Sequence, residues 1–450
     1  MPTQRSLSAE DTRDVMATLA RANGAFAASH PGDSGGRQPV HTVYGGAHLF
    51  RADVSARMGE LALRSLDRFG PDAATFARAL GVPPRLADVV YRRVREKLAR
   101  EAVEDFRADF EDGYGNRPDA EEDGHAASVA AEMAAGARRG VLPPFVGIRI
   151  KPLSEELRER SVRTLDIFVT TLVREGGGAL PPNFVVTLPK ITVPEQVGAM
   201  ADLCDRLERA LRLPAGTLRF EMMVETPESI FAEDGGVALP RLLALARGRC
   251  VAAHFGTYDY TASNNITAAH QHMNHPACDF ARQVMQVSLA GRGVWLSDGA
   301  TNVMPVPPHR AAEGETLSSA AEEENRAVVH RAWKLAYDHV QHSLELGFYQ
   351  GWDLHPAQLP VRYAAVYTFF LDGLDAAAER LRNFVAKAAQ ATLVGDVFDD
   401  AATGQGLLNF FLRAINSGAI GEEEAAPLGG LTVEELRTRS FVKILRGRAG

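Results

Sequence analysis

Eight short apolar segments, rich in β-branched and aromatic residues, recur along the first 352 residues. Most of them are continuous apolar runs without strict alternation, which is typical of strands buried on both faces in a parallel sheet. The predicted strands are Val40–Tyr44, Phe106–Phe110, Phe145–Ile150, Phe184–Leu188, Arg219–Val224, Cys250–Phe255, Gly293–Leu296 and Phe348–Trp352.

Segments with helical spacing of apolar residues lie between these strands. They are predicted at Leu86–Ala102, Leu153–Glu175, Pro194–Leu211, Ala277–Leu289 and Ala320–Leu346. An acidic stretch, residues 116–124, is predicted to be an exposed loop after the second strand. Eight strands alternating with helices indicate an α/β protein, either a closed (β/α)8 barrel or an open doubly wound sheet. No G-x-G-x-x-G follows an early strand, so the dinucleotide-binding form of the open sheet has no support.

The two ends of the chain lack this alternation. One helix is predicted near the start, at about Ala9–Ala28, and the pattern beyond Gln358 is purely helical. The helices expected there are Asp375–Ala391, Gln405–Ile415 and Thr432–Leu445. We therefore expect an N-terminal helical extension (residues 1–39), a central α/β domain (40–360) and a C-terminal helical extension (361–450).

Composition and charge narrow the class of protein. The 450 residues carry 49 basic and 57 acidic side chains, a net charge of −8, which argues against a general nucleic-acid binder. No apolar run approaches the roughly 18 residues of a membrane span, and the N-terminus lacks the apolar core of a secretory signal. The three cysteines form no C-x-x-C pair, which fits a reducing compartment. We expect a cytoplasmic protein without nucleic-acid or membrane partners.

Most of the predicted strands end in an ionisable residue. A single charged strand end is more often simply solvated, but in a barrel all such ends would meet at one mouth. These residues, in chain order, are Glu111 and Asp112, Arg149 and Lys151, Lys190, Glu225, Asp259, Asp298, and Asp353 with His355. So many carboxylates in one cavity call for a metal ion or a bound ligand.

Glu225 and Asp259 would come from adjacent strands. Two carboxylates without a thiolate partner suit a hard cation such as Mg²⁺ or Mn²⁺, with water and substrate oxygens completing its coordination. A 2-oxo acid could chelate this cation, which would polarise the ketone and stabilise an enolate. Arg149 could place a fixed positive charge on the same oxygen. The clustered histidines His270, His272 and His275 are compatible with a metal site, with residues at the barrel mouth and with surface residues.

Six short motifs in this order resemble the HpcH/HpaI aldolase and citrate lyase beta-subunit family, with malate synthase as a more distant relative. They are DFEDG, VGIRI, LPKI, VETPES, FGTYDYTASNNI and DLHPAQL, and the resemblance runs from Val43 to Gln358. It implies a (β/α)8 TIM barrel that binds Mg²⁺ or Mn²⁺. It also implies that a C–C bond next to a carbonyl is formed or cleaved through a metal-stabilised enolate.

The resemblance also implies a role for each matching residue. Glu225 and Asp259 match the metal ligands, and Arg149 matches the arginine that contacts the enolate oxygen. Asp112, with Glu111 beside it, matches the position that handles protons. Lys190 matches a lysine that orients carboxylates. The remaining residues predicted to bind substrate are Lys151, Gly256, Thr226, Asp298 and His355.

Two segments depart from the family pattern. The first strand continues into VYGGAHLF, where members that use coenzyme A carry a proline-containing segment, and this argues against a coenzyme A thioester as substrate. The third strand continues as RIKP, so Lys151 adds a charge and favours a more anionic substrate.

Three functions follow from these observations. The first is a Mg²⁺-dependent carbon–carbon lyase or aldolase acting on a small anionic 2-oxo or 2-hydroxy acid or its acyl-CoA ester. The second is a malate-synthase-like condensation of an acyl-CoA with glyoxylate, which needs a further base such as Asp372 or Asp375. The third is a metabolite-binding barrel without catalysis. A homo-oligomer is expected in each case.

Overall fold

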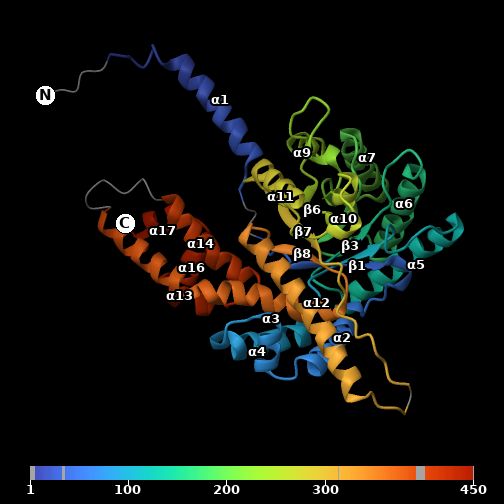
Figure 1. Cartoon of the computed structure of the whole chain (residues 1–450). Helices are drawn as coiled ribbons and strands as arrows, with labels where there is room; N and C mark the ends of the chain where they lie inside the picture. The colour runs from blue at the N-terminus through green and yellow to red at the C-terminus, as the bar shows by residue number, and fades with distance from the viewer. Residues whose placement is uncertain (1–5, 33–35, 313, 392–400, 449–450) are drawn as a thin grey trace.

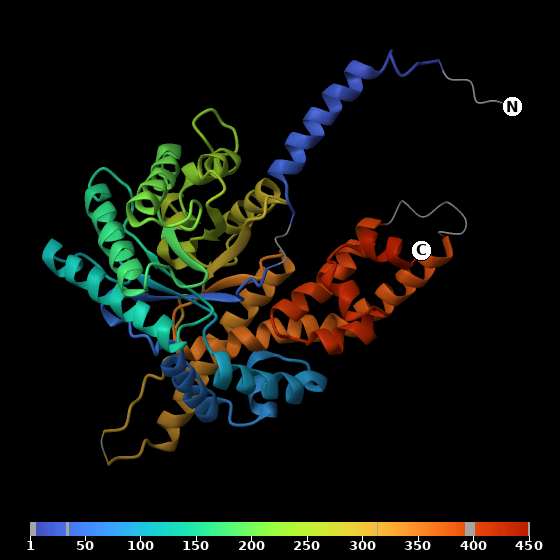
Figure 2. The ribbon, with the colours of Figure 1, turned by 180° about the vertical axis from the view of Figure 1, so that it is seen from behind.

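Eight parallel strands close into a barrel in the order β1 to β8 (Figures 1 and 2). The computed structural model describes residues 6–32, 36–312, 314–391 and 401–448. The barrel closes where β8 pairs with β1, with Gly351 beside His41. The (β/α)8 architecture is thereby confirmed. The strands are β1 (His41–Gly46), β2 (Asp105–Asp109), β3 (Phe145–Arg149), β4 (Phe184–Leu188), β5 (Arg219–Val224), β6 (Cys250–Phe255), β7 (Trp295–Ala300) and β8 (Gln350–Asp353).

Amphipathic helices surround the barrel (Figure 1). In α6, Leu165, Phe168, Val169 and Leu172 are buried at helical spacing, which is the pattern of a helix packed on a sheet. The helices of this part are α2 (Val54–Phe69), α3 (Ala73–Leu80), α4 (Ala87–Glu101), α5 (Asp119–Arg139), α6 (Arg158–Glu175), α7 (Pro194–Leu211), α8 (Pro227–Ile230), α9 (Leu239–Leu245), α10 (Thr257–Ser263), α11 (Pro276–Leu289) and α12 (Ser319–Glu345).

The acidic stretch at residues 116–124 is not wholly a loop, as predicted, because α5 already begins at Asp119. Asp119, Glu121 and Glu122 lie in its first turn, where negative charge is favourable at the positive end of the helix dipole. Glu122 is also fully buried and receives a hydrogen bond from Thr164 of α6. These acidic residues therefore form the first turn of a helix and do not belong to an exposed loop.

The two extensions differ in how they contact the barrel. Helix α1 (Arg13–Ser29) has no buried residue and projects away from the rest of the chain (Figures 1 and 2). The C-terminal helices are α13 (Leu359–Ala391), α14 (Ala401–Asn416), α15 (Glu422–Gly429), α16 (Val433–Arg437) and α17 (Phe441–Arg448). Helix α13 packs on α12 and α4, and the other four lie beside it as an arm.

Two helices of the arm differ from the prediction. Helix α13 begins at Leu359, earlier than the predicted Asp375, because its first turns pack against the barrel helices. The predicted helix Thr432–Leu445 is broken between α16 and α17, where Arg439 has a left-handed φ of 54°. Within the described residues, no helix has both the length and the apolarity to cross a membrane.

The interior of the barrel holds a buried ionic network rather than an apolar core. Arg107 of β2 donates from Nε and Nη2 to the two carboxylate oxygens of Glu221, at 2.9 and 2.8 Å, and it also pairs with Asp105. His254 lies 3.1 Å from Glu221. These side chains are all buried, and the two carboxylates also receive hydrogen bonds, Asp105 from Thr42 and Glu221 from Thr187.

A buried histidine on α12 makes stability depend on pH. His339 lies 2.8 Å from Thr301 Oγ1, and burial lowers the pKa of the imidazole to about 4. Below pH ~6.5 the unfolded chain binds a proton that the folded chain does not, so stability falls as the solution is acidified. Between pH 7 and pH 5 this group should remove about 2 kcal/mol from the free energy of unfolding.

Urea unfolding at both pH values checks this prediction. The His339→Gln variant should lose about 2 kcal/mol less than the wild type over the same range. His270→Gln, at an exposed histidine, should behave as the wild type does. An equal pH dependence in His339→Gln and the wild type would show that this histidine is not responsible.

Candidate active site

Six of the predicted site residues meet at the carboxyl ends of β2 to β6. Lys190, in the segment after β4, is the central contact. Its Nζ pairs with Glu111 and lies 3.2 Å from Asp112 and 3.4 Å from Asp259. Its backbone N–H donates to Glu225 Oε1 at 2.7 Å. Lys190 therefore joins carboxylates from three other strand ends, and we call these residues together with Arg149 the mouth cluster.

Lys190 reaches all of these partners from an unusual backbone conformation. Its φ is 48°, a left-handed value that few residues other than glycine adopt. Such strain persists only where the surroundings hold it, and it is concentrated at functional sites. The neighbouring carboxylates raise the pKa of the Lys190 ammonium, against the effect of burial, so the group stays charged.

Arg149, at the end of β3, is held rigidly by a residue that the sequence motifs did not single out. It donates from Nε and Nη2 to the two oxygens of Asp109, at 2.7 and 2.5 Å. Its guanidinium also lies over the ring of Tyr44, with 4.9 Å between Cζ and the ring centroid. The remaining nitrogen, Nη1, lies 3.0 Å from Glu111 and 3.6 Å from Asp112. Asp109 thus orients Arg149 so that one N–H edge faces the mouth cluster.

Glu111 and Asp112 are adjacent carboxyl groups in unequal surroundings. Burial, together with the charge of Asp112, raises the pKa of Glu111 to about 7 despite Arg149 and Lys190. At Asp112, burial alone would raise the pKa of the carboxyl group. A hydrogen bond from Glu111 and the charges of Arg149 and Lys190 outweigh burial, so the pKa of Asp112 is lowered. A carboxyl group that exchanges its proton near neutral pH beside an ionised one is suited to general acid–base chemistry.

Glu225 and Asp259 offer the oxygen donors that a hard cation requires. Glu225 is buried at the end of β5, and this burial, with the nearby charge of Asp259, raises the pKa of its carboxyl group to about 8. A cation at this position would favour the ionised form. No group of three or more His, Cys, Asp or Glu residues that could hold a metal occurs in the described ranges. Two protein carboxylates still fit Mg²⁺ or Mn²⁺, which keep water and substrate oxygens as ligands.

Gly256, after β6, lies directly against Glu225. A Cβ atom at this position would sit 2.4 Å from Glu225 Oε2 and 2.6 Å from Glu225 Cβ. Only glycine therefore leaves room for this carboxylate.

Replacing Gly256 with alanine should displace the Glu225 carboxylate. We expect the free energy of unfolding to fall by about 1–3 kcal/mol and the affinity for Mn²⁺ to fall about tenfold or more. Gly198→Ala is the matched control, because nothing lies within 4 Å of a Cβ atom built there. Titration with Mn²⁺ followed by electron paramagnetic resonance measures the affinity. Equal affinities in Gly256→Ala and Gly198→Ala would contradict the expectation.

Four other residues predicted to bind substrate make contacts outside the mouth cluster. Lys151 donates to Phe110 O at 2.6 Å and pairs with Glu122 at 2.9 Å. Thr226 caps α8, and His355 accepts a hydrogen bond from Ala357 N at 3.1 Å. Asp298 is fully buried and receives a hydrogen bond from Arg282 of α11 at 2.9 Å. Their roles toward a substrate stay predictions.

The three clustered histidines form no metal-binding group in the part of the chain that the structure describes. His270 ends a short 3-10 turn, whereas His275 caps α11 by accepting a hydrogen bond from Ala277 N. The rings of His272 and His275 are 5.8 Å apart between centroids.

The fold and the mouth cluster together define a (β/α)8-barrel protein with a carboxylate-rich site at the carboxyl ends of its strands. The chain belongs to the DUF6986 family, described as a domain of unknown function, whose family model matches residues 19–444. No curated protein sequence matches it.

Several solved structures are similar to this chain. Malate synthase from Haloferax volcanii, in a magnesium/glyoxylate complex, aligns at 14% identity and a TM-score of 0.44, over 73% of this chain and 76% of that one. An HpcH/HpaI aldolase/citrate lyase family protein from Burkholderia cenocepacia aligns at 12% identity and a TM-score of 0.38, over 73% and 92% of the two chains. An HpcH/HpaI aldolase from Desulfitobacterium hafniense aligns at 12% identity and a TM-score of 0.36, over 76% and 93%. These are the families that the sequence motifs resemble.

Proposed function

We propose that this protein is a metal-dependent carbon–carbon lyase or aldolase acting on a small 2-oxo or 2-hydroxy acid. The observation that carries the proposal is the arrangement of the mouth cluster. The rigidly held Arg149 contacts Glu111, and Lys190 joins Glu111 to Asp259, which is paired with Glu225 in the proposed metal site. An enolate formed in such a place would meet fixed positive charge without rearrangement of the site.

Each side chain of the cluster has a task in this reaction. Arg149 presents Nη1 to the substrate oxygen that gains charge, while Asp109 fixes its orientation. Asp112, whose side chain is 59% exposed, accepts the substrate hydroxyl proton, and Glu111 holds or returns a proton beside it. Glu225 and Asp259 would hold Mg²⁺ or Mn²⁺, which supplies a Lewis acid for the substrate carbonyl.

Lys190 keeps the carboxyl groups oriented and offsets part of their charge. It lies within ion-pair distance of Glu111, Asp112 and Asp259, so it is already engaged by carboxylates. Its raised pKa keeps it protonated, which argues against a nucleophilic amine and a Schiff base. The substrate carboxylate would add to this cluster as one more anion for Lys190 and Arg149.

The malate-synthase-like alternative depends on an additional acidic base beyond Gln358. Asp372 of α13 instead pairs with Arg85 at 2.5 Å. Asp372, one of the two candidate bases, is therefore already engaged in an ion pair. This favours the lyase or aldolase reaction over the malate-synthase-like condensation.

Thermal unfolding in the presence of 2-oxo and 2-hydroxy acids tests the proposal. Each acid is added with Mg²⁺, with Mn²⁺ and after chelation of divalent ions. We expect at least one acid to raise the unfolding temperature only when a metal is present, because ligands that bind the folded state stabilise it. Equal stabilisation after chelation would contradict the metal assignment, and no stabilisation by any acid would contradict the substrate class.

A further inference from the structure

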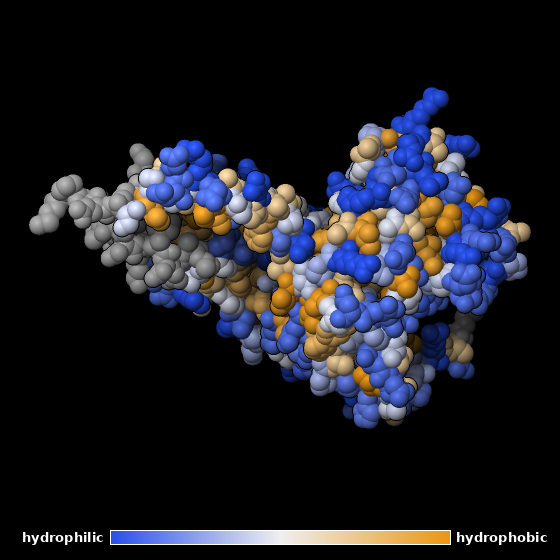
Figure 3. Space-filling model, turned by 90° about the horizontal axis from the view of Figure 1, so that it is seen from above, coloured by the Kyte–Doolittle hydropathy of each residue, from blue (hydrophilic) through white to orange (hydrophobic). Residues whose placement is uncertain are grey.

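A second charged cavity lies between the barrel and the C-terminal arm, away from the mouth cluster. It has a volume of about 860 Å³ and is bordered by the linker before β1, by α4 and by α14. Seen from above, the molecule is hollowed between the arm and the barrel (Figure 3). Cavities of roughly 300–1,000 Å³ are those that hold small-molecule ligands.

The described lining of this cavity is basic, although the whole chain is acidic. Three carboxylates line it, Glu101, Glu104 and Glu422. Six basic side chains line it, Arg37, Lys97, Arg100, Arg413, Arg437 and Arg439. The described residues of the lining therefore sum to a formal charge of +3, against −8 for the full chain.

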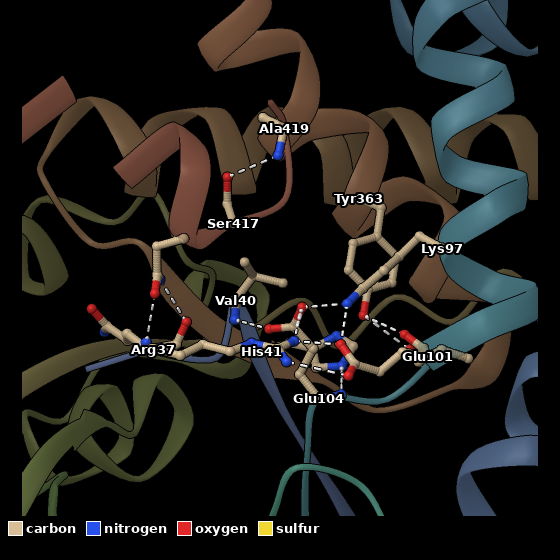
Figure 4. Close-up of polar contacts among 12 residues, drawn as sticks. Arg37, Val40, His41, Lys97, Glu101, Glu104, Tyr363, Ser417 and Ala419 are labelled. Atoms are coloured by element: carbon tan, nitrogen blue, oxygen red, sulfur yellow. Dashed lines mark hydrogen bonds and ion pairs between the residues drawn. The ribbon is translucent and has the colours of Figure 1, made fainter. Parts of the chain in front are cut away.

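The three carboxylates are already compensated by three of these cations. Lys97 Nζ lies 2.6 Å from Glu104 and 2.5 Å from Glu101 (Figure 4). Arg37 pairs with the same two carboxylates and lies 2.8 Å from Glu104. Arg437 pairs with Glu422 at 2.6 Å.

Arg100 and Arg439 remain without an ion pair to any carboxylate in the described parts of the chain. Arg100 belongs to α4, and Arg439 belongs to the break between α16 and α17. Arginine binds phosphate and carboxylate groups through two parallel N–H donors, so two arginines facing one cavity suit a ligand with more than one anionic group.

The backbone that presents Arg439 is held in place. Its left-handed φ of 54° is uncommon for a residue with a Cβ atom. The Gln405 side chain donates to Arg439 O at 3.3 Å and accepts from Phe441 N at 3.0 Å. Strained conformations of this kind persist only where the surrounding fold imposes them. The fold therefore fixes the backbone position of Arg439 at the cavity.

The wall opposite the arm is rigid and reaches the barrel. Glu104 accepts a hydrogen bond from Val40 N at 2.8 Å, and its own N–H donates to His41 Nε2 at 3.0 Å (Figure 4). His41 in turn pairs with Asp353 of β8 at 2.8 Å. An anion in the cavity would thus meet a preformed surface, which limits the entropy lost on binding.

We propose that the cavity between α4 and the C-terminal arm binds a small polyanion that carries two or more phosphate or carboxylate groups. The site is separate from the mouth cluster, and it needs neither a bound metal nor turnover at the mouth. It can be tested whether or not the proposed enzymatic function holds.

Calorimetric titration of the full chain in metal-free buffer tests this proposal with inorganic pyrophosphate and tricarballylate, a tricarboxylate without a keto or hydroxyl group, as probes. We expect one of them to bind, and the tighter probe identifies the anionic group. The double variant Arg100→Ala/Arg439→Ala should bind it at least ~10-fold more weakly. Arg64→Ala/Arg92→Ala is the matched control, because both arginines lie on exposed helix faces and form only surface ion pairs. This control should bind as the wild type does.

A third variant separates the cavity from the mouth. Lys190→Met removes a cation of the mouth cluster and should leave the affinity for the probe unchanged. Binding of neither probe to the wild type would overturn the proposal. So would equal affinity in the wild type and Arg100→Ala/Arg439→Ala, or loss of binding in Lys190→Met.

Discussion

The Glu225→Gln variant should lose metal-dependent binding of 2-oxo acids, and its turnover should fall at least ~10²-fold. Glutamine keeps the shape of the side chain but offers a neutral oxygen where the cation needs a carboxylate. Asp259→Asn should have the same effect, because this carboxylate is the other proposed ligand. Mn²⁺ titration and turnover of the acid found in the thermal screen measure the two losses.

The same variant should not weaken the metal-free fold. Glu225 is buried, and burial disfavours the charged form of a carboxyl group, so the neutral amide should keep or raise the free energy of unfolding. Loss of metal binding together with unchanged or higher stability excludes misfolding as the cause. Glu228→Gln, at an exposed position of α8, is the matched control and should change neither property. Unchanged Mn²⁺ affinity in both Glu225→Gln and Asp259→Asn would refute the metal assignment.

The Arg107→Met variant should lose about 3–5 kcal/mol of unfolding free energy. Arg107 is the shared cation of Glu221 and Asp105 inside the barrel, and methionine would leave Asp105 buried without a cation and Glu221 with His254 alone. Adding Glu221→Gln should restore part of the loss, because it removes one of the two buried carboxylates that lost Arg107. Chemical denaturation of the single and double variants measures both effects.

A surface arginine provides the comparison for Arg107. Arg95 pairs with Asp67 on the outside of the molecule, where an ion pair contributes only about 0–1 kcal/mol. Arg95→Met should therefore cost far less than Arg107→Met. If the two variants lose the same stability, the interior network does not stabilise the barrel in the way described.

The barrel could be predicted because its strands are apolar runs of regular spacing. All eight predicted strands are present, and β4, β5 and β6 have the predicted bounds. Apolar runs on both faces are a strong signal, since the parallel strands of a barrel are covered by helices outside. The break between α16 and α17 gave no such signal, since the residues around Arg439 fit a continuous helix.

The mouth cluster could be predicted only in part. Charged residues at the ends of apolar runs, or up to four positions beyond them, located Glu111, Asp112, Arg149, Lys190, Glu225 and Asp259. Asp109 was missed because it lies inside β2, where Asp105, Arg107 and Asp109 alternate along an otherwise apolar segment. That alternation was the available signal for an interior polar face. The left-handed conformation of Lys190 has no counterpart in the sequence pattern.

Solvent deuterium exchange into a 2-oxo acid tests the central claim most directly, because it detects the enolate without knowledge of the second substrate. Pyruvate and longer 2-oxo acids are incubated with the protein in D₂O, with and without Mg²⁺, and the C3 protons are followed by nuclear magnetic resonance. The proposed mechanism predicts exchange that requires the metal and is lost in Glu225→Gln and Arg149→Met but not in Glu228→Gln. Absence of exchange with every acid that binds, or exchange that persists in both mouth variants, would contradict it.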